Sequence, residues 1–172
     1  MRVAPLGAWF AEDIDKVIHE ATLSAEVTHT HHEGVVGAVA VALAASWVVR
    51  RQQQNHSQPA PHLLPWVISH LENSEVKKRL EWAATYPLET WQFTVASEVG
   101  SGHQISAQDT VPFCLWMAAA QLDNFCEAMW TTARVGGDID TNCAIIGGIV
   151  ALNVGQEGFP EIWKQSRETL KW

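Results

Sequence analysis

The sequence predicts an all-α protein whose 172 residues form one compact domain. Apolar residues recur at helical spacing along most of the chain, and the only stretch with the composition of a β-strand covers residues 90–95. Two apolar runs, residues 35–49 and 144–152, have no polar face, which indicates helices buried on all sides. No repeat, low-complexity tract or linker divides residues 1–172, so a single domain is expected.

The N-terminal third is predicted to hold two helices. The first covers residues 13–25, where apolar side chains at positions 14, 17, 18, 21 and 25 share one face. The second covers residues 33–50 and contains the longest apolar run, residues 35–49. This run is shorter than the roughly 20 residues that a transmembrane helix needs, so we expect a central, buried helix.

The middle of the chain is predicted to alternate loops and short helices. Residues 52–61 are polar and bounded by proline, which indicates a loop. Residues 62–85 follow a helical pattern that Asn73 and Ser74 are expected to break into two helices. Residues 89–98 leave two alternatives open, a short helix or irregular structure.

The C-terminal part is predicted to contain four more helices, over residues 109–120, 123–133, 138–153 and 161–170. Pro112 is expected in the first turn of its helix, where a missing N–H is tolerated. Gly136 and Gly137 are expected to end the second of these helices. Gly147 and Gly148 each cost about 1 kcal/mol of helix propensity relative to alanine, so they predict that neighbouring helices approach closely there.

The charge balance argues against a nucleic-acid partner. Eleven Lys and Arg residues against 19 Asp and Glu residues give a formal net charge of -8, whereas affinity for a phosphate backbone rests mainly on basic side chains. Cys114, Cys126 and Cys143 show no metal-binding or CxxC spacing, and such a sparse, odd set is typical of a reducing cytoplasm. Pro5 and Gly7 interrupt the first residues, which therefore do not resemble a signal peptide. We expect a cytoplasmic protein that does not bind membranes.

The segment following Gly136 and Gly137 carries the most chemistry. Asp138, Asp140 and Thr141 place three oxygen-bearing side chains within four positions at the start of a buried helix. Carboxylate and hydroxyl oxygens suit hard cations such as Mg²⁺ or Mn²⁺. The same residues also suit an N-cap, since Asp and Thr satisfy free N–H groups at the positive end of a helix. The spacing alone leaves both interpretations open.

Two further clusters carry weaker signals. Residues 28–34 contain three histidines, but neighbouring side chains do not point at one centre, so a polar cap for the following helix is expected rather than a zinc site. Residues 100–103 form a glycine-rich stretch that could cradle a phosphate, yet it lacks the Lys-Ser/Thr of a Walker A motif and predicts only a loop.

Taken in order, these pieces resemble the ADP-ribosylglycohydrolase family. The resemblance rests on residues 1–7, on residues 24–29 with Glu33, Gly34, Gly37 and Ala38, on residues 102–116, and on residues 136–142 leading into 144–148. It covers nearly the whole chain. The last of these motifs, in this context, is the most specific.

The resemblance implies an all-α fold and an enzyme that removes ADP-ribose from modified side chains or small acceptors with two Mg²⁺ or Mn²⁺ ions. By resemblance, Asp138, Asp140 and Thr141 would be metal ligands and His29 would lie near bound ADP-ribose. Gly137 would allow the ligand to approach. The expected partners are ADP-ribose and ADP-ribosylated proteins or small molecules.

The family pattern also includes an N-terminal half with an early acidic residue, a Thr-Asp-Asp motif and a glycine-rich loop, and this sequence contains no Thr-Asp-Asp. The resemblance is therefore to the C-terminal half, and a metal is expected to bind weakly because Mg²⁺ demands a nearly complete octahedral ligand set. Two function classes follow. One is an ADP-ribosyl hydrolase that is truncated or completed by another polypeptide, and the other is a noncatalytic remnant that binds a ligand or a partner. No residue is assigned as catalytic.

Self-association as a homodimer is the last expectation. In the full family fold, N-terminal helices would cover the apolar runs at residues 35–49 and 144–152. Without that cover we expect a broad apolar surface, and soluble monomers seldom expose contiguous patches of more than a few hundred Å². A two-fold dimer is the commonest way of closing such a surface.

Overall fold

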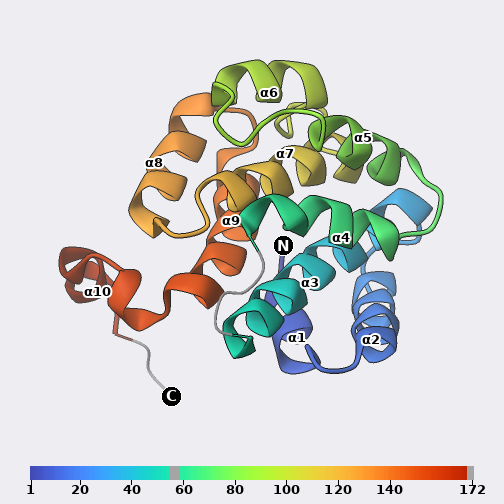
Figure 1. Ribbon diagram of the computed structural model, residues 1–172, viewed down its shortest axis with the longest axis horizontal. Helices are drawn as coiled ribbons and strands as arrows, with labels where there is room; N and C mark the ends of the chain where they lie inside the picture. The colour runs from blue at the N-terminus through green and yellow to red at the C-terminus, as the bar shows by residue number, and fades with distance from the viewer. Residues whose placement is uncertain (55–58, 170–172) are drawn as a thin grey trace.

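The computed structural model describes residues 1–54 and 59–169, and this part of the chain is helical with no strand (Figure 1). The α-helices are α1 (Ala4–Trp9), α2 (Ile14–Glu26), α3 (His32–Gln53), α4 (Leu63–Ser69), α5 (Glu75–Ala83), α6 (Gln92–Val99), α7 (Ala107–Ala120), α8 (Phe125–Val135), α9 (Ile139–Val154) and α10 (Glu161–Ser166). Two 3₁₀ turns, Ala60–His62 and Gln156–Gly158, lie between them. The all-α class predicted from the sequence is confirmed.

Helix α3 forms the centre of the fold, as its apolar sequence predicts. It packs against α1 and α2 and also against α4, α7 and α9. By length and composition α3 could cross a membrane, but 67% of its most apolar window is buried inside the protein. Its side chains from Val36 to Val48 are almost all buried, which explains why the helix lacks a polar face.

Two glycines of the second apolar helix, α9, allow α8 and α1 to pack closely against it. A methyl group on Gly147 would stand 3.3 Å from the sulfur of Met129 in α8, and one on Gly148 would stand 3.2 Å from the Cβ of Ala4 in α1. Both spacings are tighter than ordinary van der Waals contact. The close helix approach predicted from the two glycines is therefore confirmed.

Side-chain caps start several helices where the sequence predicts a boundary. Asp13 accepts a hydrogen bond from the Lys16 N–H at 3.1 Å at the start of α2. Ser74 accepts one from the Lys77 N–H at 3.0 Å and starts α5, so the predicted break at Asn73 and Ser74 is confirmed. Each cap satisfies an N–H group that the helix itself leaves free.

Of the two alternatives left open for residues 89–98, the short helix is confirmed, since Gln92–Val99 form α6 and Val95, Ala96 and Val99 bury one helical face. Two other predicted boundaries are wrong. Helix α7 begins at Ala107, so Pro112 lies in its second turn and not in the first, and the carbonyl of Gln108 loses its helical donor. Helix α3 extends to Gln53, into the expected loop, of which residues 55–58 lie outside the described part of the chain.

The last helix is shorter than predicted, since α10 ends at Ser166, while Leu170 lies outside the described residues. Figure 1 shows α10 at the edge of the molecule, away from the other helices. Aromatic contacts connect this region to α8, with the rings of Phe125 and Phe159 4.3 Å apart and those of Trp130 and Trp163 6.2 Å apart.

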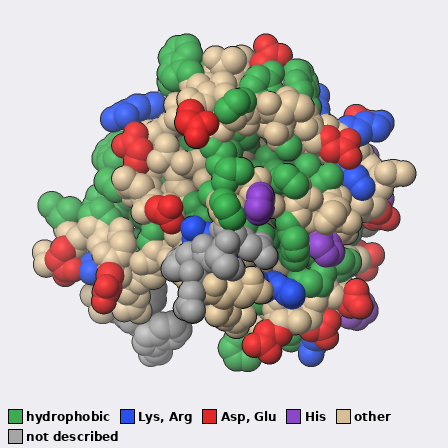
Figure 2. Space-filling model, in the orientation of Figure 1, with side chains coloured by type: hydrophobic (Ala, Val, Ile, Leu, Met, Phe, Trp, Pro, Cys, Tyr) green, Lys and Arg blue, Asp and Glu red, His purple; other side chains and the backbone are tan. Residues whose placement is uncertain are grey.

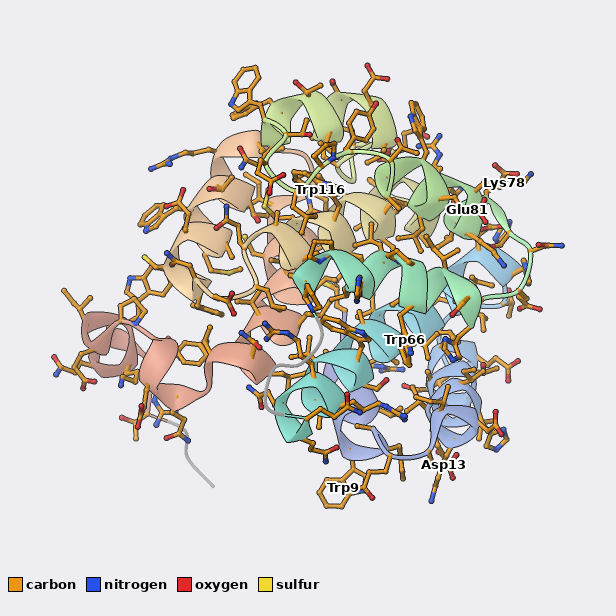
Figure 3. All side chains as sticks on the ribbon, viewed as in Figure 1. Trp9, Asp13, Trp66, Lys78, Glu81 and Trp116 are labelled. Carbon is orange, nitrogen blue, oxygen red and sulfur yellow. The ribbon has the colours of Figure 1, made fainter. Side chains whose placement is uncertain are left out.

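The tryptophans divide between the core and the surface. Trp47 and Trp116 are fully buried, and the indole of Trp116 donates a hydrogen bond to the Tyr86 carbonyl at 3.1 Å. Trp9 is 83% exposed and points outward from α1, whereas Trp116 lies inside (Figure 3). Acidic side chains are scattered over the face in Figure 2 and do not gather into one patch.

The structure does not expose the two apolar helices as broadly as expected. Helices α1, α2 and α7 cover α3, while α1, α7 and α8 cover α9, and Ile145, Ile146, Ile149 and Val150 of α9 are buried within this chain. The apolar surface on which the homodimer prediction rested is therefore largely closed by the chain's own helices. The homodimer itself stays a prediction.

Candidate functional site

A cleft of about 500 Å³ gathers four segments that are distant in the sequence. Its wall includes Met1–Val3, the end of α2 with the loop before α3, the segment that starts α7, and the first turn of α9. These are the four stretches that suggested the family resemblance. The cleft is of the size that small-molecule sites commonly have, about 300–1,000 Å³.

Asp138 and Thr141 line this cleft at the start of α9. Asp138 is the N-cap, and its Oδ1 accepts a hydrogen bond from the Thr141 N–H at 3.3 Å, so the capping interpretation describes the observed geometry. A distance of 3.3 Å is long for an N–H···O bond, and one bond leaves further lone pairs of the carboxylate available. Asp140 is exposed and is not part of the cleft wall.

His29 also lines the cleft, from the loop between α2 and α3. Its Nδ1 is 2.8 Å from the hydroxyl of Thr28. The ring packs on Gly34, where a methyl group would stand 3.2 Å from the His29 Cδ2. His29 is thus held by its neighbours in a position facing the same cleft as Asp138 and Thr141.

The other two histidines serve different contacts. His31 starts α3 and its Nδ1 accepts a hydrogen bond from the Glu33 N–H at 3.2 Å, as the predicted polar cap requires. His32 lies toward the loop before α5, with its Nδ1 3.7 Å from a carboxylate oxygen of Glu72. Within residues 1–54 and 59–169, no group of three His, Cys, Asp or Glu side chains is placed to hold one ion.

Glu33 is a cleft residue whose role the sequence did not indicate. Its two carboxylate oxygens accept hydrogen bonds from the backbone N–H groups of Glu75 and Val76, at 3.0 and 2.9 Å. These are free N–H groups in the first turn of α5, where a negative charge is favourable. Glu33 therefore ties the cleft side of α3 to α5.

The glycine-rich stretch forms a loop, as predicted, and it supports the first turn of α9. The Ser101 carbonyl accepts two hydrogen bonds, from the Asp138 N–H at 3.1 Å and from the Asn142 side-chain amide at 2.8 Å. Asn142 is fully buried, and the thiol of Cys114 lies 3.3 Å from its other side-chain atom, Oδ1. The loop thus contacts α9 through buried polar groups.

The structure gives Gly137 a contact with the glycine-rich loop, and its role in the approach of a ligand stays a prediction. It is not part of the cleft wall, and a Cβ atom there would stand 1.9 Å from the Ser101 carbonyl oxygen. Its φ of +79° also lies in the region that favours glycine. In this structure the glycine makes room for the Ser101 peptide.

A strained residue stands at the cleft wall before α7. Ile105 has a φ of +52°, which is rare for a β-branched residue, and its side chain is 86% exposed. The next residue, Ser106, has a buried hydroxyl oxygen without a hydrogen-bond partner. Both line the cleft, and such strain and unpaired polar atoms tend to cluster at functional sites.

The three cysteines are free, and burial controls the reactivity of two of them. Burial raises the pKa of the Cys114 thiol strongly, with a smaller contribution from Cys143. Burial and then the Asp140 carboxylate raise the pKa of Cys143 above its usual value. A raised pKa lowers the fraction of reactive thiolate at neutral pH.

These environments predict a defined order of alkylation. With iodoacetamide at about pH 7.5, Cys114 should stay unmodified in the folded protein and Cys143 should react slowly, because the thiolate is the nucleophile. Raising the pH to about 9 should speed up the reaction of Cys143 but not that of Cys114. Peptide mass spectrometry would measure both rates. Rapid labelling of Cys114 without denaturant would contradict the packing of α7 on α9.

The first turn of α9 carries oxygen donors of the kind that a divalent ion binds. Asp138 and Thr141 face the cleft with a carboxylate and a hydroxyl oxygen, and Asp140 adds a second carboxylate in the same turn. Oxygen donors of this kind suit Mg²⁺ or Mn²⁺. Asp140 is exposed and outside the cleft wall, so the described residues of the wall supply only part of an octahedral ligand set.

Comparison with known proteins adds to this geometry. An uncharacterised protein of Archaeoglobus fulgidus is 30% identical over 167 residues, which is 95% of this chain and 50% of that protein. ADP-ribosylhydrolase ARH3 of Bos taurus is 25% identical over 201 residues and that of Gallus gallus is 26% identical over 201 residues; the matches cover 98% and 99% of this chain and 52% and 53% of those proteins.

The chain thus spans about half the length of the curated relatives it matches. No solved structure matches it significantly. The ADP-ribosylglycohydrolase family model matches residues 1–172, the whole of the chain. This chain therefore belongs to the ADP-ribosylglycohydrolase family.

Proposed function

We propose that this chain forms the ADP-ribose-binding part of a hydrolase that releases ADP-ribose from N- or O-linked acceptors with a divalent metal. The observation that carries the proposal is that His29, Asp138 and Thr141 all line one cleft of about 500 Å³. Three of the residues expected from the family resemblance thus line one cavity, although more than 100 positions separate His29 from Asp138. The name of the ARH3 relatives supports the same class of substrate.

The cleft has two kinds of wall, which suit the two kinds of surface on ADP-ribose. Apolar side chains include Val41, Val111 and Ile145, while polar ones include Thr28 and Thr110. Ligand sites commonly combine an apolar lining with a few polar groups that fix orientation. We assign the apolar wall to the base and the polar groups to the ribose and diphosphate.

In this proposal hydrolysis breaks the bond between the anomeric carbon and the acceptor atom. The oxygen of water forms the new bond to that carbon, and one of its protons leaves with the acceptor. Asp138, Asp140 and Thr141 would hold the metal, which would supply Lewis-acid polarisation of the ribose oxygens. His29 would orient the bound ADP-ribose, and the enclosing cleft would exclude bulk water.

The experiment is a calorimetric titration of ADP-ribose into this chain, with Mg²⁺ and with EDTA. We expect Asp138→Ala and His29→Ala to weaken binding by about tenfold or more, which corresponds to roughly 1.4 kcal/mol. The matched control is Asp15→Asn, because Asp15 is an exposed acid in the first turn of α2 and lies outside the cleft. Absence of ADP-ribose binding by the unmodified chain, or an equal loss in Asp15→Asn, would contradict the proposal.

A second assay separates the two function classes. Release of free ADP-ribose from ADP-ribosyl-arginine and ADP-ribosyl-serine peptides would be followed with Mg²⁺ present. We expect this chain alone to bind ADP-ribose but to turn over slowly, because its ligand set for the metal is partial. Binding without turnover would fit a noncatalytic module, whereas turnover abolished by Asp140→Ala would make the chain sufficient for catalysis.

A further inference from the structure

We propose that Asp109 is a positioning residue, which fixes the cleft carboxylate of Asp138 through the loop formed by residues 100–104. As far as ligand binding is concerned, this inference rests on the proposed function. Asp109 is only 3% exposed, and it lies in the first turn of α7 behind the cleft wall. A buried carboxylate is costly unless hydrogen bonds and a cation compensate it, so its partners identify what it holds.

The partners of Asp109 are almost all in or beside the loop. Its Oδ2 accepts a hydrogen bond from the Gln104 N–H at 2.8 Å, and its backbone carbonyl accepts one from the Gly102 N–H at 3.1 Å. A Cβ atom on Gly100 would stand 2.1 Å from the Asp109 Oδ1. The loop therefore contacts both the carboxylate and the backbone carbonyl of Asp109.

Arg79 of α5 is the cationic partner of Asp109. Its Nη1 lies 3.9 Å from the Asp109 Oδ1 and donates a hydrogen bond to the Val99 carbonyl at 3.3 Å, just before the loop begins. The guanidinium thus bridges the carboxylate and the end of α6. Its side chain is 32% exposed, so the Coulomb attraction is partly screened, and the hydrogen bonds to the loop matter more.

The same loop contacts Asp138 at the start of α9. The Ser101 carbonyl accepts the Asp138 N–H at 3.1 Å and the Asn142 side-chain amide at 2.8 Å. A Cβ atom on Gly102 would stand 2.7 Å from the Cβ of Asp138. The loop therefore contacts both the backbone nitrogen and the Cβ of Asp138. The positions of these two atoms limit where the carboxylate can point.

The test is amide hydrogen exchange measured residue by residue in the full chain. Asp109→Asn keeps the shape of the side chain but replaces charge-assisted hydrogen bonds by weaker neutral ones. We expect the N–H groups of Gly102, Gln104 and Asp138 to exchange about tenfold faster or more, while the core of α3 is unchanged. Arg79→Gln acts on the same carboxylate from a partly exposed position, and should shift the same amides in the same direction.

The matched control is Thr132→Val in α8. Thr132 is fully buried and its hydroxyl donates to the Ala128 carbonyl at 2.7 Å, so the variant removes a buried hydrogen bond away from the cleft. Faster exchange of the three loop and α9 amides in Asp109→Asn but not in Thr132→Val supports the positioning role. Unchanged exchange in Asp109→Asn, or equal changes in Thr132→Val, would overturn it; if Asp109→Asn does not fold, Arg79→Gln decides by the same criterion.

A ligand arm separates this inference from the proposed function. We expect Asp109→Asn to weaken ADP-ribose binding by about tenfold and Thr132→Val by less than about twofold. If the unmodified chain does not bind ADP-ribose, the proposed function fails, but the exchange measurement still decides whether Asp109 orders Asp138. If the chain binds and exchange is unchanged in Asp109→Asn, the function stands and the positioning role falls.

Discussion

Replacing Gly137 with alanine is expected to lower the free energy of unfolding by about 4 kcal/mol, and to weaken any ligand binding that depends on Asp138. The new Cβ would stand 1.9 Å from the Ser101 carbonyl oxygen and 2.6 Å from the Ser101 hydroxyl oxygen. The loop would have to withdraw, so the hydrogen bonds from Asp138 and Asn142 to that carbonyl would weaken, each worth about 1 kcal/mol. The positive φ of +79° adds about 1–2 kcal/mol of strain for a residue with a side chain.

Gly136→Ala provides the matched control for this substitution. Gly136 has a similar φ of +85°, but a Cβ atom there would meet nothing within 4 Å. It should lose only the backbone term, about 1–2 kcal/mol. Urea unfolding followed by tryptophan fluorescence would give both free energies. Equal losses in the two variants would show that the contact with Ser101 is not what requires glycine at position 137.

Most of the helices, and several of their starts, could be predicted because they depend on local pattern. The apolar residues of α3 leave no polar face, which predicts a buried helix, and α1, α2 and α7 cover it in the structure. Ser74 caps α5 through a hydrogen bond to a residue three positions on, which the sequence alone can suggest. Signals of this kind do not require knowledge of distant contacts.

The start of α7 could not be predicted in the same way. Ser106 is extended and Ile105 has a positive φ, so the helix begins at Ala107 and places Pro112 in its second turn. This geometry depends on the loop before the helix, which Asp109 holds through the Gln104 N–H. Contacts of that kind outweigh local propensity, and no composition rule reveals them.

The candidate site also combines features that local pattern predicts with features that depend on distant contacts. The pattern around Asp138 predicted an oxygen-rich helix start, and the family resemblance connected it with His29. Which of the three donors face the cleft is a matter of helix geometry, because positions three apart share a face and positions two apart do not. Asp138 and Thr141 therefore line the cleft and Asp140 does not. The buried carboxylate of Asp109 was missed, since an acid beside a glycine-rich stretch is usually a solvated loop residue.

Gly7→Ala is expected to have the second large effect, through the crossing of α1 and α3. A Cβ atom on Gly7 would stand 2.0 Å from the Ala42 carbonyl oxygen and within 2.8 Å of two further backbone atoms of Ala42. Backbone atoms cannot turn aside as a flexible side chain can, so α1 would have to move away from α3. We expect a loss of about 3 kcal/mol or more in the free energy of unfolding, even after the gain of about 1 kcal/mol in helix propensity.

The matched control for Gly7 is Gly148→Ala, which tests the other side of the same contact region. Its new methyl group would meet only the Cβ of Ala4, at 3.2 Å, and a shift of a few tenths of an ångström would accommodate it. That variant should stay within about 1 kcal/mol of the unmodified protein. Because Met1, Arg2 and Val3 line the cleft directly before α1, Gly7→Ala should also weaken ADP-ribose binding, whereas Gly148→Ala should not. Thermal unfolding and calorimetry of the two variants would measure both effects, and a Gly7→Ala protein as stable as the unmodified one would mean that α1 does not lie this close to α3.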